Sequence, residues 1–250
     1  MYYLCISTVI QESAMLMTTG GQAVSTPGWE TSIALRNMAL LQHSLPKYLL
    51  APEVAVLLSF FEDERQRMVF SFLWNTGARI TEALLVTPED LELDGPRPFV
   101  RLRTLKQRSR GRGRPAKDEK IARVLPLMDD SFVRDLRRYL ATFRPARRSA
   151  LFPITRKTAW SWLTQALNRA EAAGISFAVN PVSPKTLRHS FAMHLFFNHV
   201  PKKVVQTYLG HERPDSTEVY LKVFALDVAP QLGIRFSLDA QDYAGMLTRK

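Results

Sequence analysis

The sequence contains a single cysteine and no long apolar run. Because Cys5 stands alone among 250 residues, an internal disulfide framework and a cysteine-rich zinc module are excluded, and a reducing cytoplasm is the expected compartment. No apolar stretch approaches the roughly 18 residues that cross a bilayer, so we expect no membrane partner. The first ten residues have neither a basic leader nor a small-residue cleavage site, so we expect no signal peptide.

Acidic residues are scarce in one part of the chain, where the positive charge is concentrated. The net charge is +11, and residues 97–124 hold eleven basic side chains opposed only by Asp118 and Glu119. A local positive field of this kind attracts polyanions, and nucleic acid is the first candidate. A solvated basic loop is the alternative. The arginines that we predict to contact DNA are Arg101, Arg103, Arg108, Arg110, Arg112 and Arg114.

Hydrophobic periodicity predicts a mainly α fold with a small antiparallel β-sheet, an α+β class. Residues 99–103 and 121–125 alternate as strands do, and we expect them to form a hairpin with the arginine-rich segment at its tip. Start signals such as Asp129 and Ser183-Pro184, together with apolar spacing, predict the helices. These helices are expected over residues 52–61, 64–74, 79–86, 129–143, 156–172, 183–198, 201–209 and 214–224.

The same patterns divide the chain into three parts. Residues 1–45 are expected to be a weakly ordered N-terminal extension, in which residues 32–42 can form a short helix. Residues 46–230 are expected to form the helical domain with its sheet. Residues 231–250 form a tail, and apolar groups from residue 226 onward either dock on a neighbouring subunit or pack on the same chain.

Three separated segments carry more specific patterns. They are residues 75–82 (NTGARITE), 183–192 (SPKTLRHSFA) and 208–220 (YLGHERPDSTEVY). In this order they resemble the tyrosine recombinase, or phage integrase, family, whose patterns include TGxRxxE, HxLRHxxA and an LGH segment followed by a threonine and a tyrosine. The resemblance spans about residues 46–225. It implies the fold of the tyrosine recombinase catalytic domain, a DNA breaking-rejoining enzyme.

Two arginines of these segments, Arg79 and Arg188, suit the chemistry of a phosphodiester. Its pentacoordinate transition state concentrates negative charge on the non-bridging oxygens, which planar and permanently charged guanidinium groups can clamp. Either arginine alone would more readily be a surface ion-pair partner, but the combined pattern favours the catalytic role. Glu82 lies one turn after Arg79 on the same helix face, and we expect it to orient that arginine.

Tyr220 is the predicted nucleophile. A phenol has a pKa of about 10, so it attacks well only when its proton is taken or its anion is stabilised. The resemblance implies that Tyr220 becomes joined to the 3′ phosphate and frees a 5′ hydroxyl, while His211 hydrogen-bonds the scissile phosphate. Because the ester conserves the bond energy, rejoining needs neither ATP nor a metal. No cofactor is expected, and no His or carboxylate spacing in the sequence indicates a metal site.

Two lysines complete the predicted site. Lys185 stands where the family has the first histidine of HxLRH, and it keeps a donor for the phosphate while being a poor base at neutral pH. The resemblance implies that a hairpin lysine protonates the leaving 5′ oxygen; Lys106 is our choice, and Lys117 and Lys120 are rivals. His189 is expected to have a structural role and to be turned away from the side of Lys185.

The resemblance implies a site-specific recombinase acting on double-stranded DNA sites, as a homotetramer on two of them and with accessory DNA-bending proteins. About 45 residues precede the patterns, too few for the helical domain that usually comes first. We therefore expect a minimal member similar to fimbrial-type invertases or plasmid resolution enzymes, at the bacterial nucleoid or a plasmid. Plasmid resolution, inversion and integration or excision all use such a site. The alternatives are a non-catalytic DNA-binding accessory protein and a type IB topoisomerase-like relaxing enzyme.

Overall fold

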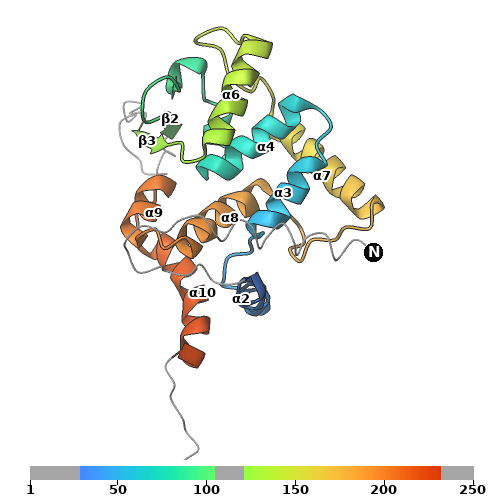
Figure 1. Cartoon of the computed structure of the whole chain (residues 1–250), viewed down its shortest axis with the longest axis vertical. Helices are drawn as coiled ribbons and strands as arrows, with labels where there is room; N and C mark the ends of the chain where they lie inside the picture. Colours follow the sequence, from blue (N-terminus) through green and yellow to red (C-terminus); the bar gives the residue numbers. More distant parts are fainter. Residues whose placement is uncertain (1–28, 105–120, 232–250) are drawn as a thin grey trace, which may run out of the picture.

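The computed structural model describes residues 29–104 and 121–231 of the chain (Figure 1). As predicted, these ranges are mostly helical, with one three-stranded antiparallel sheet of order β1-β2-β3. In chain order the elements are α2 (Trp29–Leu41), α3 (Ala51–Ser59), α4 (Glu64–Thr76), α5 (Ile80–Ala83), the 3-10 turn η1 (Pro88–Asp90), β1 (Leu91–Glu92), β2 (Phe99–Thr104), β3 (Ile121–Pro126), α6 (Asp130–Phe143), α7 (Arg156–Ala172), α8 (Pro184–Phe197), α9 (Lys202–Leu209) and α10 (Asp215–Gln231).

The predicted hairpin is confirmed by the pairing of β2 with β3. Val100 lies opposite Leu125, and Leu102 lies opposite Arg123. Because side chains alternate between the two faces of a strand, Arg123 shares its face with the buried Leu102 and Leu125. β1 pairs with β2 on the side opposite β3. The sequence does not predict β1, because a strand of two residues is too short to show alternation.

Local signals set the helix ends that hold the site. The carboxylate of Asp63 accepts from the backbone N–H of Arg65 at the start of α4, and the hydroxyl of Ser183 accepts from that of Thr186 at the start of α8. Such caps satisfy donors that the first helical turn leaves without partners. α4 ends at Gly77, whose φ of 57° lies in the left-handed region that glycine enters freely.

Most helices lie within two residues of the predicted ends, and α5 and α10 differ most in length. α5 covers only residues 80–83, because the chain then tightens into hydrogen bonds three residues apart, from the N–H of Leu85 to the carbonyl of Glu82 and from Val86 to Ala83. α10 continues beyond Phe224 to Gln231. α10 packs against α2, and the sequence of α10 alone does not reveal this contact.

The core consists of two apolar clusters, and α8 contributes to both. One cluster packs α4 and α8 against α6 and α7, with Phe72, Leu136, Leu163 and Leu187 almost completely buried. The second cluster joins α8, α9, α10 and α2, and it includes Phe196. In Figure 1 α8 lies in the middle of the molecule, between α4 and the pair α9 and α10. This double packing fixes the helix that carries the second motif.

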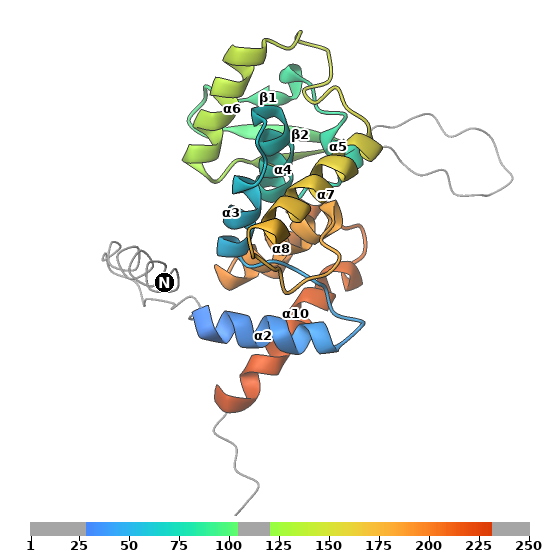
Figure 2. The same ribbon diagram turned by 90° about the vertical axis from the view of Figure 1, so that its right-hand side faces the viewer.

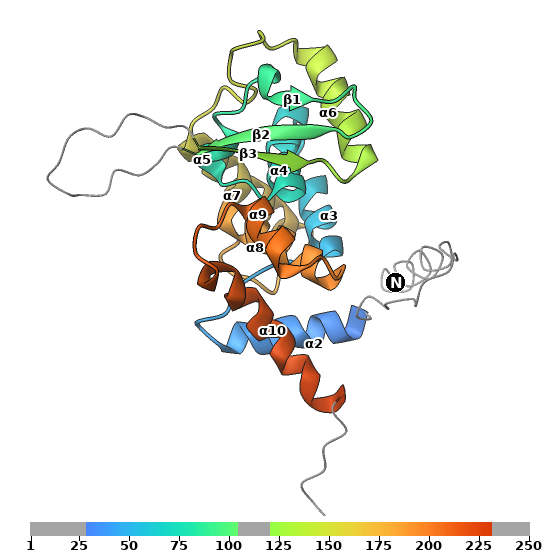
Figure 3. The same ribbon diagram turned by 90° about the vertical axis from the view of Figure 1, so that its left-hand side faces the viewer.

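Within the N-terminal segment of residues 1–45, the structure confirms the short helix expected over residues 32–42. α2 forms where a short helix was predicted, and it crosses α10 at the lower end of the molecule (Figures 2 and 3). Leu35 and Ala39 are each 1% exposed, and the buried Arg36 pairs with Glu53. Sequence patterns do not show this burial of α2, because it depends on α10, which lies far along the chain. Residues 1–28 and 232–250 lie outside the described residues.

None of the helices in the described ranges has both the length and the apolar character of a membrane span.

Candidate active site

The three motif segments, far apart in sequence, meet around Arg188 on α8. Its Nη1 donates to the carbonyl of Gly77 at 2.7 Å, and its Nη2 donates to the carbonyl of Leu209 at 2.6 Å. These carbonyls belong to the first and third motifs, so one guanidinium group joins all three segments. Arg188 is only 6% exposed. Burial, followed by the neighbouring charge of Arg79, lowers the pKa of Arg188 to about 10, which leaves it cationic at neutral pH.

Glu82 forms the anionic centre of the site. Its Oε1 accepts from Nη1 of Arg79 at 2.7 Å, and its Oε2 accepts from the backbone N–H of Arg79 at 2.8 Å. This is the contact expected from the spacing of the two residues. Burial alone would raise the pKa of Glu82, but hydrogen bonds and charge from Arg123, then from Arg79, outweigh it and lower the pKa to about 2. The carboxylate is therefore ionised over the whole working range of pH.

Arg123 is a site residue that the sequence reasoning missed. Its Nη1 and Nη2 donate to the two oxygens of Glu82 at 3.0 and 2.8 Å, and its Nε donates to the carbonyl of Tyr208 at 2.9 Å. The arginine was grouped with the basic hairpin. Strand alternation was the available signal, because Arg123 is two residues before the buried Leu125 and so lies on the inner face of β3.

Tyr220 is held inside the protein with its phenol against α8. The side chain is 2% exposed, and its hydroxyl lies 2.8 Å from Nδ1 of His189. Burial raises the pKa of Tyr220 to about 12, while the positive charges of Arg188 and Arg79 act in the opposite direction. The phenol thus lies within the electrostatic field of both predicted clamp arginines. It is protonated at neutral pH in the structure as it stands.

His189 does not lie where the sequence reasoning expected it. The prediction that it turns away from Lys185 is wrong, because residues four apart on a helix share a face, and both side chains line the same pocket. Burial, then the charges of Lys185 and Arg188, lowers the pKa of His189 to about 4. The imidazole is therefore neutral at neutral pH and can accept the hydrogen bond from Tyr220.

His211 follows the end of α9 and is held by α10. Its Nδ1 lies 2.8 Å from Oγ1 of Thr217, and its backbone carbonyl accepts from the amide of Gln206. Burial, then the charges of Arg188 and Arg79, lowers the pKa of His211 to about 4. With Nδ1 on the threonine, the other ring nitrogen is available to a ligand.

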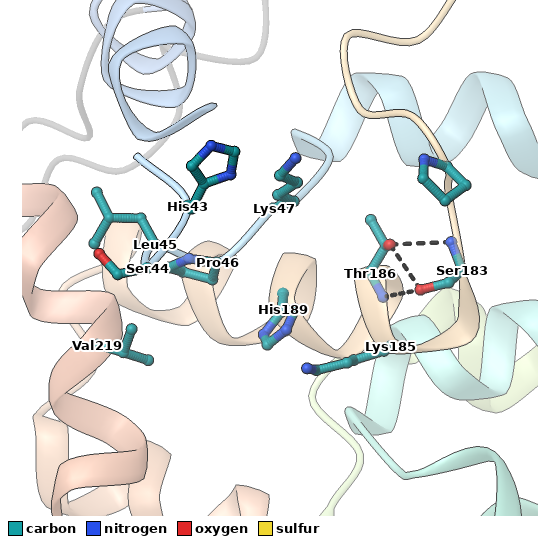
Figure 4. Close-up of a pocket in the computed structure, with 11 residues that line it drawn as sticks. His43, Ser44, Leu45, Pro46, Lys47, Ser183, Lys185, Thr186, His189 and Val219 are labelled. Atoms are coloured by element: carbon teal, nitrogen blue, oxygen red, sulfur yellow. Dashed lines mark hydrogen bonds between the residues drawn. The ribbon is translucent and has the colours of Figure 1, made fainter. Parts of the chain in front are cut away.

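A pocket of about 430 Å³ opens beside His189, the residue that contacts the hydroxyl of Tyr220 (Figure 4). Lys185 and His189 on α8 form its floor, the segment 43–47 forms one wall, and Val219 of α10 forms another. Lys47 and Lys185 are both exposed, so the pocket has a cationic rim directly next to the residue that holds Tyr220. The full lining is His43, Ser44, Leu45, Pro46, Lys47, Pro181, Ser183, Lys185, Thr186, His189 and Val219.

The structure describes two of the six arginines predicted to contact DNA, Arg101 and Arg103. Arg101 donates to the carbonyl of Glu89 at 2.6 Å, and Arg103 pairs with the buried carboxylate of Asp90, so both also brace η1 against β2. Among residues 29–104 and 121–231, no group of three or more potential ligands is placed to hold a metal ion. The remaining predicted residues of the hairpin lie outside the described residues: Lys106, Arg108, Arg110, Arg112, Arg114, Lys117 and Lys120.

Comparisons with known proteins agree with the geometry. The sequence profile of the phage integrase family matches residues 47–226. The chain is 49% identical over 217 residues to an Escherichia coli protein described as "Probable site-specific recombinase in afa region", covering 87% of each chain. It is 42% identical over 237 residues to an Escherichia coli "Resolvase", covering 89% of this chain and 91% of that protein.

A solved structure shows the same fold at low sequence identity. The XerH site-specific recombinase bound to palindromic difH substrate, in a post-cleavage complex, matches with a TM-score of 0.55 and 20% identity. The match covers 85% of this chain and 57% of that chain.

Proposed function

This chain belongs to the phage integrase family and is a site-specific tyrosine recombinase, and we propose that it cleaves and rejoins DNA through an ester between Tyr220 and a 3′ phosphate. The observation that carries the assignment to Tyr220 is its position. The phenol contacts His189 at 2.8 Å and lies in the field of Arg188 and Arg79. A tyrosine placed only for packing would not need its hydroxyl on the helix that carries Arg188, where positive charges from two separate motifs act on it.

The charged groups of the site match the demands of the transition state. Arg79 is exposed enough to meet a ligand, with 43% of its side chain accessible, and it and Arg188 would hold the non-bridging oxygens as negative charge grows on them. His211 would donate a third hydrogen bond from the nitrogen that Thr217 leaves available. Lys185, on the rim of the pocket, would donate to the phosphate rather than act as a base.

The chemical step balances without a cofactor. The phenolic oxygen of Tyr220 attacks phosphorus and the bond from phosphorus to the 5′ oxygen breaks. His189 is the group placed to take the phenolic proton, and the negative phosphate that DNA brings raises the proton affinity of its imidazole. A hairpin lysine, Lys106 by our proposal, protonates the leaving 5′ oxygen. Rejoining is the same step in reverse, with the 5′ hydroxyl as the nucleophile.

The DNA strand next to the scissile phosphate would pass over the pocket in Figure 4. Lys47 and Lys185, which both line the pocket, would meet backbone phosphates there. Arg101 and Arg103, with the hairpin arginines, would meet the flanking duplex. We propose residues 46–230 as the catalytic domain and 231–250 as a tail that docks on a neighbouring subunit. Four copies would assemble on two DNA sites, in the nucleoid or on a plasmid, with DNA-bending proteins as accessories.

The test is covalent trapping on a nicked suicide duplex that carries the target site, found by sequencing DNA attached to the protein in cells. We expect the wild-type protein to form a complex that survives denaturation, and Tyr220→Phe to bind the duplex without forming it. Binding without covalent attachment by the wild type would instead assign an accessory role. Relaxation of supercoiled DNA without strand exchange between two sites would assign a topoisomerase-like activity.

A further inference from the structure

We propose that Arg123 is a positioning residue of the recombination reaction, which holds Glu82 and the end of α9 in the arrangement that cleavage needs. The role rests on the proposed function. It goes beyond the motif residues, because Arg123 lies outside all three segments that carry them. Its contacts join strand β3 to two of those segments.

The first set of contacts fixes the carboxylate that orients Arg79. Arg123 spans both oxygens of Glu82, at 3.0 and 2.8 Å, and Glu82 in turn receives the side chain and the backbone N–H of Arg79. The side chain of Arg123 is 11% exposed and that of Glu82 is 3% exposed. A two-pronged contact between planar groups fixes orientation as well as distance. If Arg123 is removed, Glu82 loses this two-pronged contact, while Arg79 and Arg188 are the residues proposed to engage the phosphate.

The second contact fixes the turn that carries His211. Nε of Arg123 donates to the carbonyl of Tyr208 at 2.9 Å, one residue before Leu209, whose carbonyl accepts from Arg188. In Figure 3 α9 lies beside β3, which brings these groups together. The two arginines thus hold consecutive carbonyls at the end of α9, directly ahead of His211.

Gly210 shows how closely Arg123 packs against this turn. A Cβ atom at Gly210 would lie 3.0 Å from both Cδ and Nη1 of Arg123, and its φ of 63° is in the left-handed region. Both features favour glycine at this position. Arg123 therefore packs directly on the backbone of this turn, in the space that the Cβ of any other residue would need.

The charges around Glu82 explain why the position needs a permanent cation. Glu82 faces Arg79 from α5, Arg123 from β3 and Arg188 from α8, the last at 3.9 Å, and it also acts on the imidazole of His211. Arg123 is the member of this group that lies outside the three motif segments, and its three nitrogens donate to Glu82 and to the carbonyl of Tyr208. It can therefore balance the carboxylate while Arg79 and Arg188 engage the substrate.

The experiment compares Arg123→Gln and Arg123→Lys with the full-length wild type, by the single-turnover rate of covalent complex formation on the suicide duplex over a range of pH. We expect Arg123→Gln to slow cleavage by about tenfold to hundredfold with unchanged Kd for the duplex. The acidic limb of the pH–rate profile of Arg123→Gln should move to higher pH. Without Arg123, burial raises the pKa of Glu82 with less opposition. Arg123→Lys keeps the charge, so it should cleave faster than Arg123→Gln, and its acidic limb should lie closer to that of the wild type.

Arg169→Gln is the matched control. Arg169 on α7 donates from Nε to the carbonyl of Phe60 at 2.9 Å, the same kind of contact that Arg123 makes with Tyr208. The Arg169→Gln variant should keep the wild-type cleavage rate and pH–rate profile. The role of Arg123 is overturned if Arg123→Gln cleaves with the wild-type rate and acidic limb, if it loses affinity and rate in parallel, or if both Arg123 variants are unfolded by circular dichroism. A wild type that forms no covalent complex overturns the proposed function itself.

Discussion

The phenolic oxygen of Tyr220 lies 2.8 Å from Nδ1 of His189, across 31 residues of chain. The phenol is protonated and the imidazole is neutral, since burial raises the pKa of Tyr220 to about 12 and lowers that of His189 to about 4. The pair is therefore a neutral hydrogen bond that docks the proposed nucleophile on the helix that carries Arg188. It becomes a path for the proton only when a phosphate changes the local field.

This hydrogen bond predicts energetic coupling between the two side chains. Tyr220→Phe and His189→Phe each remove the bond while keeping a ring, and each should lower the free energy of unfolding by about 1 kcal/mol. The double variant should lose less than the sum of the two, by about 0.5 to 1.5 kcal/mol. Urea denaturation of the four proteins measures the cycle. Strict additivity would show that the contact contributes nothing in solution.

The two clamp arginines should differ in their effect on stability. Arg188 is buried and holds the carbonyls of Gly77 and Leu209, so Arg188→Ala should lower the free energy of unfolding by about 3 kcal/mol. Arg79 is half-exposed and Glu82 keeps Arg123 without it, so Arg79→Ala should cost about 1 kcal/mol or less. Both variants should slow cleavage by about a hundredfold or more. Denaturation and suicide-substrate assays measure the two effects separately, and normal cleavage by both would mean that the site is misassigned.

The two partly buried histidines of the site, His189 and His211, should make the protein less stable in mild acid. Burial, then neighbouring cations, lowers the pKa of His189 and of His211 to about 4, whereas in the unfolded chain each has its ordinary value of about 6.5. Between these values the unfolded state binds protons that the folded state does not, so the free energy of unfolding falls as pH drops from about 6.5 to about 4. A shift of this size corresponds to at most about 3 kcal/mol for each group. Because both side chains are partly exposed, we expect a smaller combined loss than the sum.

Urea denaturation at a series of pH values measures this dependence. His189→Phe should flatten it, because one of the two titrating groups is gone. His43→Gln is the control, since His43 is an exposed histidine on the rim of the same pocket. A profile for His189→Phe as steep as that of the wild type would contradict the assignment.

We expect Lys47, which lines the pocket beside His189, to contact a DNA phosphate. Lys47→Gln should reduce the slope of log K against log salt by about 0.9, the value for one phosphate contact. Arg134→Gln removes one charge from the exposed face of α6, which does not line the pocket, and it should leave the slope unchanged. Titrations of a labelled duplex at several salt concentrations give both slopes. Equal slopes for Lys47→Gln and the wild type would place the DNA away from this wall.

The sequence by itself determined the local structure and the chemistry-bearing residues. α7 was predicted over residues 156–172 and is found there, and the hairpin of β2 and β3 and the start of α6 after Asp129 are as expected. These features depend on caps, turns and apolar spacing within a few residues. The motifs also indicated the family, since residue types at fixed spacing do not require a fold to be seen.

Only the tertiary structure decided which of these residues act together. The contacts of Glu82 with Arg123, of Arg188 with Gly77 and of Tyr220 with His189 join positions 41, 111 and 31 residues apart. No local period encodes such pairs, because they form where separate elements pack. The same packing removes water from the histidines, the tyrosine and the carboxylate, and so it sets the protonation states on which cleavage would depend.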